Sequence, residues 1–162
     1  MKTEDLYSIY LKHPQVSTDT RNIPDQSIFF CLKGERFDGN IFAREALEKG
    51  AAYVVTDSRQ PFADSRLIQV EDVLQTLQQL AAYHRSQLQI PVIGITGTNG
   101  KTTTKELVTA VLSRKYRVAA TKGNLNNHIG VPLTLLSIRP EHEIAVVEMG
   151  RTIRGRLPSC VK

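Results

Sequence analysis

The chain has 162 residues, enough for one domain or for two small ones. Apolar residues make up 41% and charged residues 23%, as in ordinary globular proteins, and no apolar run reaches the roughly 18 residues of a membrane-spanning helix. The net charge of +5 comes from residues 151–162, which hold four basic residues and no acidic one, so the rest of the chain carries only +1. A basic stripe with interleaved aromatic residues is also missing, which argues against nucleic-acid binding.

The cysteine content and the N-terminal residues point to the cytoplasm. Cys31 and Cys160 lie far apart and have no metal-like spacing, which is typical of a reduced protein. Residues 1–14 mix Asp, Glu and Lys with apolar residues and do not form a signal peptide.

The first segment, residues 1–86, is predicted to form a compact α/β domain. Helical spacing is found over residues 5–11, and Asn40 is placed to cap a second helix over residues 41–49, which Gly50 ends. Strands are predicted over residues 27–32, 51–55 and 66–70, with a turn over residues 33–36. Residues 72–86 form an amphipathic pattern whose inward side holds Val73, Leu77, Leu80 and Ala81. Cys31 is expected in the core, and His13, His84 and His142 at the surface or at helix ends.

The second segment, residues 87–150, alternates strands and helices. Strands are predicted over residues 90–95, 116–121 and 143–148, and helices over residues 101–115 and 131–138. The inward side of the first helix is expected to hold Leu107, Val108, Val111 and Leu112. This order is the start of a doubly wound parallel sheet, truncated at about three strands.

A phosphate-binding loop is predicted between the first strand and the first helix of this segment. Its residues are Gly97, Thr98, Asn99, Gly100, Lys101, Thr102 and Thr103. Glycines let backbone N–H groups approach phosphate oxygens, and the helix N-terminus adds partial positive charge. Lys101 is expected to neutralise the β- and γ-phosphates of ATP, and the Thr102 hydroxyl to ligate Mg²⁺. The motif lacks the first glycine of a strict Walker A pattern, because position 95 is Ile, and a simple helix-capping turn is the alternative.

Three groups of residues resemble the Mur ligase family, the ATP-dependent amide-forming enzymes of peptidoglycan synthesis. They are Ser17–Arg21 with Phe29–Gly39, then Gly97–Thr102, and finally Thr121–Asn127 with Gly130–Leu136 and Glu148–Gly150. The resemblance implies a small UDP-sugar-binding α/β domain followed by the start of an ATPase domain with a phosphate loop. The last group is most similar to the ligases that join D-alanyl-D-alanine to UDP-N-acetylmuramoyl-tripeptide. These family members act as cytoplasmic enzymes, and a monomer is expected for the full-length form.

The resemblance also implies roles for single residues. Lys101 and Glu148 are expected to be catalytic, and Thr102 with Glu148 to hold Mg²⁺, because Glu148 ends an apolar strand at the carboxyl edge of the sheet. Substrate contacts are expected from two groups: Thr18, Asp19, Arg21, Lys33, Gly34, Phe37, Asp38 and Gly39 in the first segment, and Thr121, Asn124, Asn126 and Asn127 in the second. The alternatives are an ordinary surface ion pair for Asp19 and Arg21, and plain turns for the glycine- and asparagine-rich loops.

Residues 151–162 depart from the family, which usually continues with Ala-Asn-His-Pro-Gly-Glu-Ile after Glu-Met-Gly. A codon string for the family's continuation, read one base later, encodes residues 151–162. This predicts the loss of one nucleotide after the Gly150 codon, with a natural basic tail as the alternative. A chain interrupted in this way is expected not to ligate by itself. Two other functions stay open: a non-catalytic module that binds a UDP-sugar peptide, and the ligase that adds the third peptide residue.

Overall fold

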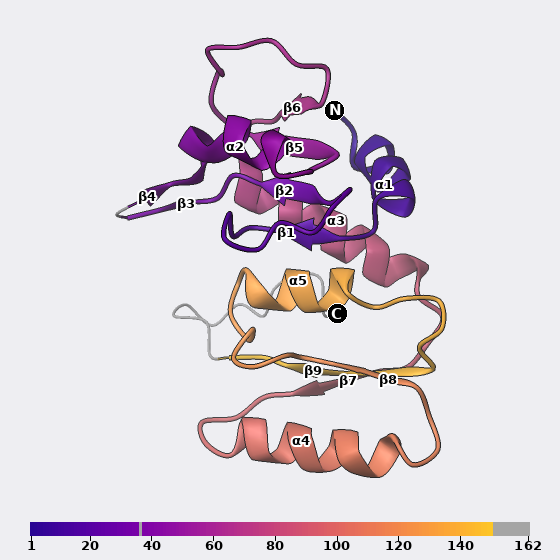
Figure 1. Ribbon diagram of the computed structural model, residues 1–162. Helices are drawn as coiled ribbons and strands as arrows, with labels where there is room; N and C mark the ends of the chain where they lie inside the picture. The colour runs from indigo at the N-terminus through magenta and orange to yellow at the C-terminus, as the bar shows by residue number, and fades with distance from the viewer. Residues whose placement is uncertain (36, 151–162) are drawn as a thin grey trace. The chain divides into compact units, whose positions relative to one another are not determined.

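The structure is a computed structural model that describes residues 1–35 and 37–150 (Figure 1). The chain divides into two compact units, Met1–Leu80 and a second that begins at Ala81. The boundary falls inside helix α3 (Val73–Gln87), whereas the sequence places it after residue 86, at the end of this helix. The predicted divisions 1–86, 87–150 and 151–162 stay predictions, and the frameshift hypothesis concerns residues outside the described ones. No helix within the described residues is long and apolar enough to cross a membrane.

The first unit is built on a four-stranded parallel sheet in the order β1-β2-β5-β6. Its strands are β1 (Val16–Ser17), β2 (Ile28–Phe30), β5 (Tyr53–Thr56) and β6 (Leu67–Gln69). A short antiparallel hairpin of β3 (Lys33–Gly34) and β4 (Phe37–Asp38) projects from it in Figure 1. The helices are α1 (Thr3–Lys12), the 3₁₀ helix η1 (Gly39–Phe42), α2 (Ala43–Glu48) and the first part of α3.

The core of this unit joins the sheet to α2. Ala43, Ala46 and Leu47 follow the i, i+3, i+4 spacing of an inward helix face, and they pack with Phe29 and Val54 of the sheet. Cys31 belongs to the same cluster, as expected, and burial raises the pKa of its thiol to about 12. The predicted cap at Asn40 is wrong. Asp38 accepts a hydrogen bond from the Asn40 N–H at the start of η1, and the Asn40 side chain points into a buried polar network instead.

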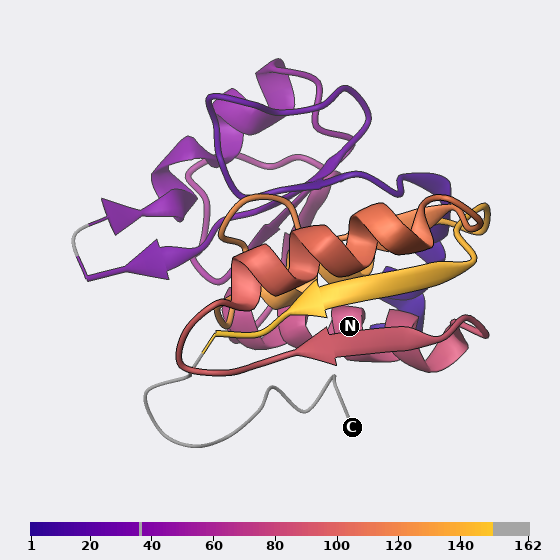
Figure 2. The same cartoon turned by 90° about the horizontal axis from the view of Figure 1, so that it is seen from below.

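The second unit is a three-layer arrangement in which α4 and α5 lie on opposite faces of a parallel sheet (Figure 1). The strands β7 (Val92–Ile95), β8 (Val118–Ala120) and β9 (Ile144–Glu148) run in the order β7-β9-β8, with β9 central. The helices are α4 (Lys101–Leu112) and α5 (Gly130–Leu136). Figure 2 shows β7 and β9 side by side and pointing the same way. The predicted α/β class with parallel strands is confirmed.

One prediction about burial in this unit is wrong. Leu107 and Val111 are 64% and 71% exposed, because α4 turns Lys105 and Leu112 toward the protein and so directs the other two residues outward. His84 lies in the last turn of α3, at a helix end as predicted, but it is only 6% exposed, and its Nε2 lies 3.2 Å from the Ile138 carbonyl oxygen. Burial lowers the pKa of this imidazole below its usual range.

Candidate functional site

The phosphate loop connects β7 to α4 in the conformation that its glycines require. Gly97 and Gly100 have φ of 152° and 75°, a region that side-chain-bearing residues rarely adopt. Gly100 is the N-cap of α4, so the first N–H groups of a twelve-residue helix are open toward the loop. Lys101 bends back over the loop, and its Nζ donates a hydrogen bond of 2.8 Å to the Gly97 carbonyl oxygen.

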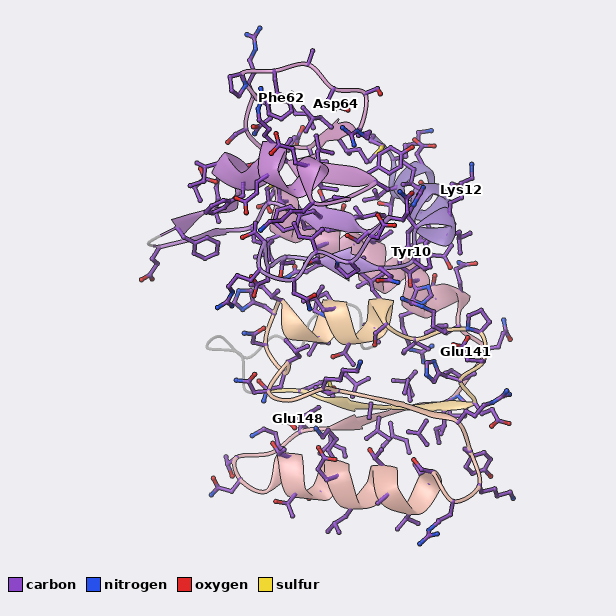
Figure 3. All side chains as sticks on the ribbon, viewed as in Figure 1. Tyr10, Lys12, Phe62, Asp64, Glu141 and Glu148 are labelled. Carbon is purple, nitrogen blue, oxygen red and sulfur yellow. The ribbon has the colours of Figure 1, made fainter. Side chains whose placement is uncertain are left out.

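A cavity of about 300 Å³ lies against this loop. Its lining residues are Thr98, Asn99, Gly100, Lys101, Thr102, Thr103, Asn126 and Glu148. Six of the seven residues predicted for ATP therefore share one cavity with the predicted metal residue. Figure 3 shows Glu148 at the end of β9, on the side of the sheet that α4 covers.

Glu148 is a buried carboxylate that is held by neutral donors. The side chain is 1% exposed, the Thr102 hydroxyl lies 3.0 and 3.2 Å from its two oxygens, and the Asn126 amide donates a hydrogen bond of 2.7 Å to Oε1. No ion pair joins it to another described residue. A buried anion without a cation is costly, and a carboxylate beside a hydroxyl is an oxygen donor set that suits Mg²⁺. The residues present therefore fit a magnesium ion at this position.

The backbone of Glu148 is fixed by Thr121, which directly follows β8. The Glu148 N–H donates a hydrogen bond of 2.9 Å to the Thr121 hydroxyl oxygen, and the Thr121 carbonyl oxygen accepts one of 2.8 Å from Lys105 Nζ. Thr121 is only 2% exposed, so this structure gives its hydroxyl to Glu148 rather than to a substrate. Sequence reasoning missed Lys105, which lies on α4 and is 1% exposed.

The asparagines of the loop 122–127 have three different surroundings. Asn126 bonds Glu148, as described, and its own carbonyl oxygen accepts from the Gly150 N–H. Asn127 Oδ1 accepts from the N–H groups of Ile129 and Gly130, so it caps the start of α5. Asn124 is exposed and does not line the cavity. Their substrate contacts stay predictions.

A separate cavity of about 370 Å³ lies in the first unit. Its lining residues are Thr18, Asp19, Thr20, Arg21, Phe29, Phe37, Gly39 and Phe42. Five residues predicted for substrate binding, Thr18, Asp19, Arg21, Phe37 and Gly39, thus lie together. Three aromatic side chains beside a guanidinium and hydroxyl groups form a surface that suits a nucleobase attached to phosphates.

Asp19 and Arg21 form a bidentate pair at the mouth of this cavity. Arg21 Nε and Nη2 donate hydrogen bonds of 2.9 and 2.6 Å to the two Asp19 oxygens, and these bonds lower the pKa of the carboxyl to about 2. The Arg21 side chain is 88% exposed, so its other donors remain accessible to an anion. The geometry agrees with both an ordinary surface ion pair and a binding role.

Lys33, Gly34 and Asp38 shape the hairpin rather than line the cavity. Lys33 Nζ lies 2.7 Å from Asp57 Oδ1, and Asn40 Nδ2 donates to both Asp38 and Asp57 at 2.7 and 2.9 Å. Asn40 is 3% exposed and ties the hairpin to the end of β5, a role that its sequence context did not reveal.

Comparisons with known proteins agree with this architecture. Residues 14–85 match the model described as "Mur ligase family, catalytic domain", and residues 95–161 match the "Mur ligase middle domain". The UDP-N-acetylmuramoyl-tripeptide–D-alanyl-D-alanine ligase of Bacillus subtilis is 49% identical over 144 residues, which cover 88% of this chain and 32% of that protein. The ligase of the same name from Escherichia coli is 42% identical over 142 residues, with 88% and 31% covered.

Solved structures give the same result. A structure of MurF from Acinetobacter baumannii superposes with a TM-score of 0.79 at 40% identity, covering 88% of this chain and 31% of that one. MurF ligase from Thermotoga maritima, in complex with ADP, gives a TM-score of 0.75 at 35% identity, with 93% and 33% covered. The chain thus spans about a third of the length of the relatives it matches. Its two units correspond to two Mur ligase domains in chain order, and the chain belongs to the Mur ligase family.

Proposed function

We propose that this chain supplies the nucleotide-binding parts of a MurF-type ligase, which joins D-alanyl-D-alanine to UDP-N-acetylmuramoyl-tripeptide with the use of ATP. The observation that carries the proposal is the convergence of Thr102 and the buried Glu148 at the cavity of the phosphate loop. The relatives that bear this name support the reaction, and the neighbour in complex with ADP supports the nucleotide.

In the proposed reaction, the terminal carboxylate of the tripeptide takes the γ-phosphoryl group of ATP, and ADP leaves. The amine of D-alanyl-D-alanine then attacks the acyl phosphate, so that an amide bond forms and inorganic phosphate departs. Lys101 and the N–H groups at the start of α4 hold the phosphate oxygens as their charge shifts. Thr102 and Glu148 would hold Mg²⁺, whose charge neutralises the phosphates when it is bound.

The cavity at Asp19, Arg21 and Phe37 is the proposed site for the UDP end of the tripeptide substrate. Arg21 supplies exposed donors for the diphosphate, and the aromatic side chains supply a face for the uracil ring. A cytoplasmic location belongs to the same proposal, because ATP and UDP-linked precursors are found there.

Binding measurements on the 162-residue chain test the proposal. We expect ATP to bind more tightly with Mg²⁺ than with EDTA, and Lys101→Met to remove ATP binding while UDP-N-acetylmuramoyl-tripeptide still binds. Phe37→Ala should have the opposite selectivity, so each variant is the control for the other. The proposal would be contradicted if both variants lost affinity for both ligands equally, or if the wild-type chain did not bind ATP.

Turnover is the second readout. Because the relatives are about three times as long, we expect this chain to bind both nucleotides without releasing stoichiometric phosphate when D-alanyl-D-alanine is added. Phosphate release at that level would show that these residues suffice for the reaction. If a form of the protein releases phosphate, a panel of amine acceptors identifies its reaction. A requirement for D-alanyl-D-alanine indicates the proposed ligase, and a requirement for a single amino acid indicates the ligase that adds the third peptide residue.

A further inference from the structure

Lys105 is a buried cation to which the proposed reaction assigns no role. It lies one helical turn after Lys101 on α4, and its side chain is 1% exposed. Fully buried lysines are rare because removing an ammonium group from water is costly. The hydrogen bonds of its ammonium group must therefore offset that cost.

The two partners of this ammonium group are unequal. Lys105 Nζ lies 2.8 Å from the Thr121 carbonyl oxygen and 2.8 Å from Glu106 Oε1. Glu106 is 67% exposed, so water screens its charge and the pair contributes little. The bond to Thr121 is buried, and hydrogen bonds with one charged partner are about twice as strong as neutral ones.

Thr121 is the point at which three elements meet. Its N–H donates a hydrogen bond of 3.0 Å to the Val146 carbonyl oxygen of β9, and its hydroxyl oxygen accepts one from the Glu148 N–H. Its carbonyl oxygen accepts a third hydrogen bond, from Lys105 Nζ on α4. The loop 122–127, which carries Asn126, leaves directly from it. The position of Thr121 therefore bears on both the backbone of Glu148 and the amide that holds its carboxylate.

We propose that Lys105 is a positioning residue for the metal-binding end of the site. It holds Thr121, and through Thr121 it sets the direction of the Glu148 carboxylate relative to Thr102. This inference rests on the proposed function for the identity of the ion and the nucleotide. Lys105 does not line the cavity at the phosphate loop, so the loop's own phosphate contacts do not depend on it.

Lys105→Met is the test variant, because it keeps the unbranched shape and most of the apolar bulk of the side chain and removes the charge and the donors. We expect ATP affinity in EDTA to stay within about twofold of wild type, and the gain in affinity on adding Mg²⁺ to fall by about tenfold or more, the cost typical of residues that orient metal ligands. Lys115→Met removes an exposed charge just after the same helix and should leave both quantities unchanged.

Hydrogen–deuterium exchange tests the same link without nucleotide. Lys105→Met should speed exchange at the Glu148 amide and over residues 122–127, and leave the amides of α4 near their wild-type rates. If the Lys105→Met chain exchanges at the wild-type rate at these positions, the proposal is overturned. It is also overturned if Mg²⁺ raises the ATP affinity of the variant as much as it does for wild type. An equal loss of affinity with and without Mg²⁺ would overturn it as well, because it would indicate general destabilisation.

A second variant covers the case in which Lys105→Met does not fold. Lys105→Gln, like Lys105→Met, ends one atom shorter than lysine and cannot reach Thr121 from the same backbone position, but it keeps a polar head. The same two readouts apply, and a folded Lys105→Gln chain that matches wild type in both would overturn the proposal. Failure of the wild-type chain to bind ATP would refute the proposed function alone, since the exchange measurement still tests the link from Lys105 to Glu148.

Discussion

Replacing Glu148 by Gln should raise the stability of the chain in the absence of magnesium. In the presence of ATP, the stability of the variant should not change when magnesium is added. The substitution keeps the shape of a side chain that is 1% exposed and removes its charge. The two hydrogen bonds to Glu148 contribute about 1.5–3 kcal/mol each while it is charged and about 0.5–1.5 when neutral, so about 2–3 kcal/mol is lost. The penalty for burying an unpaired ion is several kcal/mol, taken as about 4 kcal/mol for this carboxylate. The difference predicts a gain of about 1–2 kcal/mol in the free energy of unfolding in EDTA.

With magnesium and ATP present, the wild-type chain should become more stable than Glu148→Gln. A ligand at 100 times its dissociation constant adds about 2.7 kcal/mol to stability, and the wild-type chain should gain it while Glu148→Gln should not. Thermal and urea unfolding in EDTA, in ATP with EDTA, and in ATP with Mg²⁺ measure both effects. Glu141→Gln, an exposed change of the same charge just before β9, is the control. A Glu148→Gln chain that is less stable than wild type in EDTA would refute the reasoning, since it would show that neutral donors alone satisfy the carboxylate.

Three further predictions concern single side chains elsewhere. The pKa of His84 is lowered in the folded protein, so the unfolded chain binds the proton more readily. The free energy of unfolding should therefore fall as the pH drops below the unfolded pKa of about 6.5. His84→Gln should flatten this pH dependence in unfolding midpoints measured from about pH 7.5 to about pH 5.5. Asn40→Ala removes side-chain bonds to two carboxylates, Asp38 and Asp57, and should cost about 3–5 kcal/mol in urea unfolding. Phe37 is 58% exposed, so Phe37→Ala should leave the unfolding midpoint near wild type and weaken UDP binding about tenfold in a titration, as expected for a lost stacking contact.

The sequence indicated which residues line the cavity at the phosphate loop because most of the signals are local, while their roles in binding stay predictions. Two glycines before a lysine define the loop, and an apolar run that ends in Glu148 defines a buried strand with an acid at its carboxyl end. Parallel strands bring such ends to one edge, and the pairing of β7 with β9, which the structure shows, brings Thr102 to Glu148. Local spacing was less informative about α4, where apolar residues occur on more than one side and the exposure of Leu107 was not foreseen.

Two of the residues that sequence reasoning missed, Lys105 and His84, share one physical cause. Nothing in the sequence around Lys105 and His84 signals burial, yet each is buried against a backbone carbonyl oxygen. The partner of Lys105 is Thr121, 16 positions away, and that of His84 is Ile138, 54 positions away. A carbonyl is present at every position and carries no residue-type signal, so only the fold identifies the partner. Glu148 was singled out because it ends an apolar run at the carboxyl end of a strand, a signal that neither Lys105 nor His84 carries. Buried polar residues held by distant backbone groups are therefore what only a structure reveals here, and Lys105 is linked to the proposed magnesium ligand Glu148 through Thr121.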